Sequence, residues 1–164
     1  MKNNPYAAKS LFEYINLTKN KRKKVRQNYI LAQIYQQEKN LKLSKKYFKK
    51  VLRSNPNYEM AFNAKMNLAR SLTYGDSDQE KTSRELQKII KDEKNKDYLD
   101  RIYYTLALMD MNKKDTVAAI KNYTLSCVNS INNNSQKALS FLDLAKIFFH
   151  QEKYSQAKTY YDST

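Results

Sequence analysis

The chain has 164 residues, of which 41% are hydrophobic and 12% aromatic, enough to bury a core. Glycine occurs once and proline twice, so helices with short polar connections are expected rather than sheets or catalytic loops. No apolar run approaches the ~18 residues of a membrane span. Residues 1–10 lack the apolar segment of a signal peptide, so we expect any export signal to lie outside this sequence.

The spacing of apolar residues predicts nine helices joined by short polar turns. In chain order they cover residues 5–18, 22–38, 41–54, 59–74, 79–93, 97–112, 115–129, 134–151 and 154–164. The predicted fold class is therefore all-α.

Four of these helices carry a leucine followed by an alanine, and the pairs recur every 37 or 38 residues. They are Leu31-Ala32, Leu68-Ala69, Leu106-Ala107 and Leu144-Ala145. The intervening helices share a three-residue pattern: a small residue, a larger residue four positions later, and a third residue three positions after that. The four copies are Ser44-Phe48-Val51, Thr82-Leu86-Ile89, Ala119-Tyr123-Ser126 and Ala157-Tyr161-Thr164. Small residues let paired helices approach closely, so this register predicts stacked helix pairs in one solenoid.

The repeat boundaries divide the whole chain. Residues 1–20 correspond to the second helix of a preceding repeat, 22–58 to repeat 1, 59–96 to a degenerate repeat 2, 97–133 to repeat 3 and 134–164 to a truncated repeat 4. Terminal repeats normally carry a polar outer face, and the last helix ends in Tyr160-Tyr161 instead. We therefore expect an internal slice of a longer array.

Repeat 1 carries a more specific pattern. The run Tyr29-Ile30-Leu31-Ala32-Gln33-Ile34-Tyr35, followed by Ser44, Phe48, Val51 and Pro56, resembles the tetratricopeptide repeat. The resemblance implies a right-handed superhelix of antiparallel helix pairs that binds protein partners. Asparagines replace glycine in the turns, where they can tolerate left-handed geometry.

In such a superhelix the first helix of each pair lines the concave surface. The lining residues are then Arg26, Tyr29, Gln33, Gln36, Asn63, Met66, Asn67, Arg70, Arg101, Tyr104, Leu108, Met111, Leu142, Lys146, Phe149 and His150. Amides, arginines and apolar side chains together suit an acidic or extended peptide. The alternative is that some of them only contact neighbouring helices.

Net charge is +15 and is concentrated near the N-terminus. Residues 1–53 hold 15 Lys and Arg against two acidic residues, a balance of +13. A basic patch is predicted from Lys21, Arg22, Lys23, Lys24, Lys45, Lys46, Lys49 and Lys50. It indicates either nucleic acid, an anionic surface or simply a solvated face. Lysines outnumber arginines and no base-stacking aromatics accompany them, so we do not expect nucleic acid.

Three segments resemble a narrower family. They are Asn55–Asn67, Arg101–Ala107 and Gln136–Ala145, and they are similar to the tetratricopeptide-repeat lipoproteins of Bacteroidetes cell envelopes, the SprE and PorW type. That resemblance implies an exported, outer-membrane-attached scaffold linked to gliding motility and type IX secretion. The alternative location is the cytoplasm.

No residue pattern indicates catalysis. The single cysteine, Cys127, cannot form an internal disulfide or a multi-cysteine metal site, and the single histidine is His150. Gly75 stands alone, so there is no phosphate-binding loop. We expect no enzyme activity, no metal and no cofactor.

Overall fold

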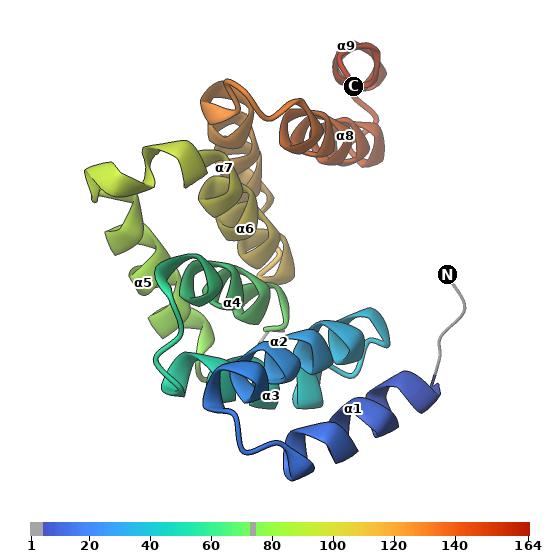
Figure 1. Ribbon diagram of the computed structural model, residues 1–164. Helices are drawn as coiled ribbons and strands as arrows, with labels where there is room; N and C mark the ends of the chain where they lie inside the picture. The colour runs from blue at the N-terminus through green and yellow to red at the C-terminus, as the bar shows by residue number, and fades with distance from the viewer. Residues whose placement is uncertain (1–4, 73–74) are drawn as a thin grey trace. The chain divides into compact units, whose positions relative to one another are not determined.

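The computed structural model describes residues 5–72 and 75–164 and divides the chain into two compact units, Met1–Leu72 and Thr73–Thr164, called unit 1 and unit 2 below (Figure 1). Unit 1 contains α1 (Pro5–Leu17), α2 (Lys21–Gln37), α3 (Leu41–Arg53) and α4 (Tyr58–Arg70). Unit 2 contains α5 (Gln79–Ile90), a 3-10 helix η1 (Glu93–Tyr98), α6 (Leu99–Asn112), α7 (Thr116–Asn129), α8 (Asn134–His150) and α9 (Tyr154–Asp162). The all-α helical-repeat prediction is confirmed.

The alanines of the repeat lie in the buried cores of the two units. Ala32, Ala69, Ala107 and Ala145 are all fully buried, as the 37- and 38-residue register predicts. The larger residues of the second helices pack beside them, with Phe48 in the core of unit 1 and Tyr123 in the core of unit 2. The repeat pattern therefore marks the core of each unit.

Asparagine and aspartate side chains begin most of these helices. Asn20, Asn40 and Asn57 each accept a hydrogen bond from the backbone N–H three residues later, as do Asp115 and Asn133. Such side chains satisfy donors that the first helical turn leaves unpaired. The connections between helices can therefore be short, because the residue that caps the next helix is itself part of the turn.

The left-handed positions of the turns differ from the expectation. Lys39, Lys114 and Glu152 hold the positive φ angles, at 58°, 62° and 60°. The neighbouring Asn40 is instead the N-cap of α3, and Asn112 is the last residue of α6. The prediction that asparagine takes the left-handed geometry in these turns was wrong. Asn55, which lies outside them and before Pro56, has a φ of 49°.

Two helices end three or more residues earlier than predicted. The helix predicted over 59–74 ends at Arg70, where the Ser71 hydroxyl bonds the Asn67 carbonyl, and positions 73–74 lie outside the described residues. The helix predicted over 79–93 ends at Ile90, and η1 precedes α6. Asn95, 1% exposed, explains this break because its side-chain amide donates to the Ile89 carbonyl and so caps the end of α5.

Candidate functional site

The first helices of unit 1 are joined to one another by polar side chains. Asn67 Nδ2 donates to the Tyr29 hydroxyl at 3.0 Å, and Gln36 Nε2 donates to the Asn67 carbonyl at 2.9 Å. Burial raises the pKa of Tyr29, an effect that the hydrogen bond from Asn67 partly offsets. Three of the predicted concave-face residues of unit 1, Tyr29, Gln36 and Asn67, are thus engaged between α2 and α4.

The remaining predicted residues of unit 1 differ in accessibility. Arg26 is exposed, while Gln33, Asn63 and Arg70 are half-buried. Met66 is 4% exposed and offers a partner almost no surface.

The first helices of unit 2 make a corresponding contact. The Tyr104 hydroxyl donates to Asp143 Oδ2 at 2.8 Å, and Lys146 Nζ donates to the other carboxylate oxygen of Asp143 at 3.0 Å. Tyr104 also packs edge-on against Tyr123, with ring centroids 5.5 Å apart. Burial, and next the charge of Asp143, raise the pKa of Tyr123, so its hydroxyl stays protonated. Asp143 was missed by the sequence analysis, although it follows Tyr104 by 39 residues as Asn67 follows Tyr29 by 38.

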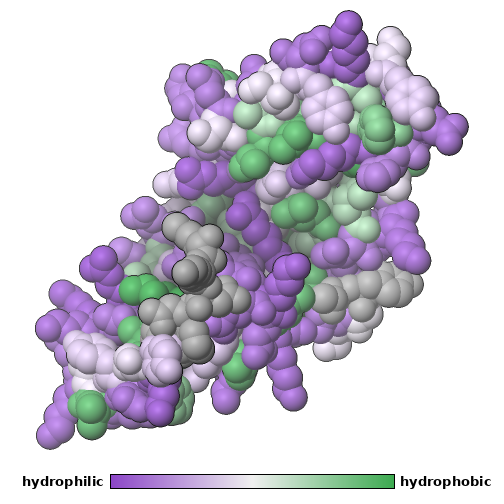
Figure 2. Space-filling view, turned by 90° about the vertical axis from the view of Figure 1, so that its right-hand side faces the viewer, coloured by the Kyte–Doolittle hydropathy of each residue, from purple (hydrophilic) through white to green (hydrophobic). Residues whose placement is uncertain are grey.

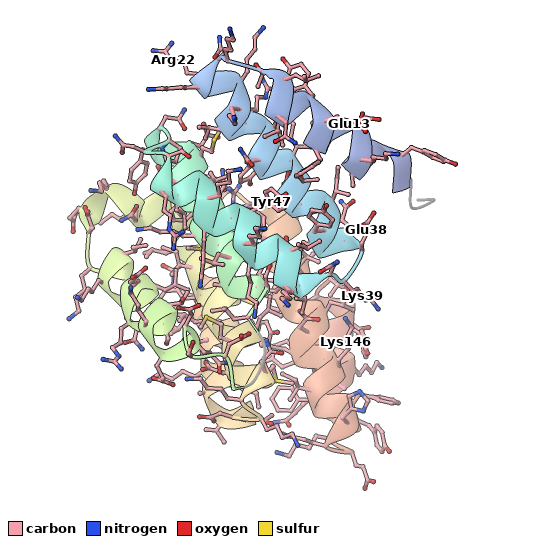
Figure 3. The ribbon with its side chains drawn as sticks, turned by 90° about the horizontal axis from the view of Figure 1, so that it is seen from below. Glu13, Arg22, Glu38, Lys39, Tyr47 and Lys146 are labelled. Carbon is pink, nitrogen blue, oxygen red and sulfur yellow. The ribbon has the colours of Figure 1, made fainter. Side chains whose placement is uncertain are left out.

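A groove of about 430 Å³ lies over this contact. It is lined by Leu108, Met111, Thr116, Tyr123, Asp143, Lys146, Ile147, His150 and Gln151, from α6, α7, α8 and the turn after α8. Ile147 is 6% exposed and forms a buried apolar part of the lining, whereas Met111 is 37% exposed and accessible to a partner. Lys146, on α8 (Figure 3), lines the groove with a side chain that is 52% exposed. We call this the α6–α8 groove.

The structure brings only part of the predicted concave set into this groove. Leu108 and Lys146 line it, together with Met111 and His150. Phe149 is 52% exposed but does not line it, and its ring packs against Tyr154 instead. Leu142 is half-buried and is also absent from the lining.

Arg101 lies at a different place in unit 2. Its guanidinium sits 5.8 Å from the Tyr98 ring centre, and it lines a separate cavity of about 420 Å³ beside Asp100. Asp100 is buried, and its carboxylate accepts from Asn133 Nδ2 at 2.9 Å and from the Arg101 backbone N–H at 2.7 Å. This carboxylate ties the loop before α8 to the start of α6, which is a structural role.

The predicted basic patch is divided between the start of α2 and the length of α3. Lys21 and Arg22 line a cavity of about 510 Å³ together with Asn55, Pro56 and Asn57. The antiparallel α2–α3 hairpin therefore places the start of α2 beside the end of α3. Lys23, Lys46 and Lys50 are exposed, and Lys24, Lys45 and Lys49 are half-buried.

Cys127 and His150 occupy different surroundings. His150 lines the α6–α8 groove, whereas Cys127 lines a cavity with Phe141 and Tyr160. Burial raises the pKa of the Cys127 thiol to about 11, which disfavours the nucleophilic thiolate. Within residues 5–72 and 75–164, no three His, Cys, Asp or Glu side chains are grouped as a metal site. In that same part of the chain, no helix combines the length and hydropathy needed to cross a membrane.

Residues 27–58 match the family model of the tetratricopeptide repeat. This segment comprises most of α2, all of α3 and the start of α4, and it lies within repeat 1 of the sequence analysis. No curated protein matches the chain. The match and the helix pairs of both units support a tetratricopeptide-type protein, a class that typically binds other proteins and is typically not catalytic.

Proposed function

We propose that this chain is a protein-interaction scaffold whose α6–α8 groove holds an extended segment of a partner. The observation that carries the proposal is the groove itself, because its lining combines apolar side chains with the charged side chains of Asp143 and Lys146. Ligand sites commonly have this composition, in which apolar lining provides affinity and a few polar groups fix orientation.

Each part of the groove has a distinct role in this proposal. Leu108, Met111 and Ile147 accept an apolar side chain of the partner. The carboxylate of Asp143 is held by Tyr104 and Lys146, so it is ordered before a partner arrives. The side chain of Lys146 is 52% exposed, so its ammonium faces a carboxylate or carbonyl of the partner.

A peptide library displayed on phage and selected on the immobilised chain tests this proposal. Selected peptides should bind at least about tenfold more weakly to Met111→Glu and to Lys146→Glu, since either change places a negative charge at the groove. Val117→Glu is the matched control, because Val117 is 81% exposed on α7 and does not line the groove. Peptides that bind all three variants like the unchanged chain would remove the groove as the site.

The location of the parent protein is a separate proposal. We propose a cell-envelope protein, on the resemblance of Asn55–Asn67 to envelope lipoproteins. Fractionation of the source cells with an antibody against this chain tests it. Recovery in the soluble cytoplasmic fraction alone would contradict the envelope location.

A further inference from the structure

The outer face of α3 carries a straight row of basic side chains. Its core face holds Ser44, Tyr47, Phe48 and Val51. On the opposite side, Lys42, Lys46, Lys50 and Arg53 are all exposed. Three or four residues separate each from the next, so they lie on one side of the helix over about 16 Å. We call these four residues the α3 row.

Carboxylates are scarce around the α3 row. Residues 1–72 contain three acidic side chains, Glu13, Glu38 and Glu59. Within the described part of the chain, the α3 row makes no ion pair. Like charges one helical turn apart destabilise a helix. The row is therefore a charge arrangement that costs stability and that a bound anion would relieve.

The α3 row continues into a cavity at one end. Arg53 is followed by Ser54, which lines the 510 Å³ cavity with Lys21 and Arg22. Figure 3 shows Arg22 at the opposite end of α2 from Glu38 and Lys39. The carboxylate near this cavity in sequence is Glu59, in the first turn of α4, two residues after the lining residue Asn57. A basic surface thus extends along α3 to the start of α2.

We propose that this surface binds an acidic segment of a protein partner, at a place separate from the α6–α8 groove. Flexible lysine side chains suit carboxylates spaced along a polypeptide. Proteins that bind single-stranded nucleic acid combine basic residues with a series of stacking aromatics, but both aromatic residues of α3 are buried, Tyr47 at 6% exposed and Phe48 fully. Membrane-surface helices insert their apolar face, and that face of α3 lies in the core of unit 1.

Charge-matched variants test the proposal. One variant combines Lys42→Gln, Lys46→Gln, Lys50→Gln and Arg53→Gln. The control combines Lys88→Gln, Lys91→Gln, Lys121→Gln and Lys158→Gln, which are exposed positions of unit 2. Both lower the net charge by four, and both should keep the circular dichroism of the unchanged chain because no altered side chain is buried.

The probes are a fluorescein-labelled glutamate-rich peptide, single- and double-stranded oligonucleotides of equal charge, and phosphatidylserine vesicles. We expect the unchanged chain to bind the peptide at low salt, the α3-row variant to bind it about tenfold more weakly, and the control to stay within about threefold. The Met111→Glu variant should bind the peptide normally, so failure of the groove and failure of this surface are distinguishable.

Four results would overturn the proposal. Equal weakening in the two charge-matched variants would show that only net charge matters. Tighter binding of either oligonucleotide than of the peptide would identify a nucleic-acid surface. Preference for vesicles would identify a lipid surface. Absence of peptide binding at low salt would exclude an acidic docking segment.

Discussion

Asp110 lies in the last turn of α6, where the helix dipole presents its negative end. Burial raises the pKa of this carboxyl above its ordinary value, an effect that the hydrogen bond from Asn122 partly offsets. Asn122 Nδ2 donates to Asp110 Oδ2 at 2.7 Å, so the carboxylate has a partner but no neutralising cation in that contact. Its charged form is therefore unfavourable in the folded chain.

We predict that Asp110→Asn stabilises the chain at pH 7 by about 0.3–1 kcal/mol. The amide oxygen can still accept from Asn122, while the charge is removed. The pKa of Asp110 is higher in the folded chain than in the unfolded chain. Ionisation of Asp110 therefore lowers the free energy of unfolding, and protonation at low pH restores it. The gain should therefore disappear below about pH 4.

Urea unfolding of both proteins at pH 7 and at pH 3.5 measures the effect. Asp97→Asn, at an exposed position of η1, is the control and should change little. A gain of equal size at both pH values would contradict the ionisation argument.

The turns within helix pairs place residues other than glycine in the left-handed backbone conformation, which is strained. Lys39, Lys114 and Glu152 each adopt a left-handed conformation between the two helices of a pair. A side chain in this conformation costs about 1 kcal/mol or more, and glycine avoids that cost. Glycine also gains entropy in the unfolded chain, which offsets part of the benefit.

We predict that Lys114→Gly stabilises the folded chain by about 0.5–1 kcal/mol. Glu152→Gly should behave alike, because both residues are exposed and have nearly the same φ, at 62° and 60°. Chemical denaturation followed by circular dichroism gives the free energy of unfolding. Lys121→Gly is the control, since it lies inside α7 and should lose about 1 kcal/mol. Destabilisation by Lys114→Gly would show that the turn prefers a side chain.

Helix positions follow from sequence because the buried alanines recur at a regular interval. Ala32 and Ala107 are both fully buried, in different units, at the positions that the repeat predicts. The lining of the α6–α8 groove was predicted only in part. Helical periodicity identifies which side chains share a face of one helix, but it does not identify which side chains of two helices contact each other. The contact between Tyr104 and Asp143 joins residues 39 apart and depends on the packing of α6 against α8. Similarly, η1 depends on one buried side chain, Asn95, rather than on periodicity.

Positive charge is divided unequally between the two units. Thirteen of the fifteen net positive charges lie in residues 1–53, within unit 1. Hydrophilic residues cover most of the face in Figure 2, with apolar areas that are small and separate. A net charge this far from zero favours solubility and destabilises the compact state through repulsion. Stability should therefore depend on ionic strength.

We predict that raising NaCl from about 20 mM to about 300 mM increases the Tm by a few degrees, as the screening length falls from roughly 20 Å to 6 Å. The α3-row variant should respond less to salt than the control with four Lys→Gln changes in unit 2, although both have the same net charge. The reason is that repulsion is strongest where Lys42, Lys46, Lys50 and Arg53 lie one turn apart. Thermal melts followed by circular dichroism measure the response of all three proteins. Equal salt responses in the two variants would show that the repulsion depends on the net charge of the chain and not on the α3 row.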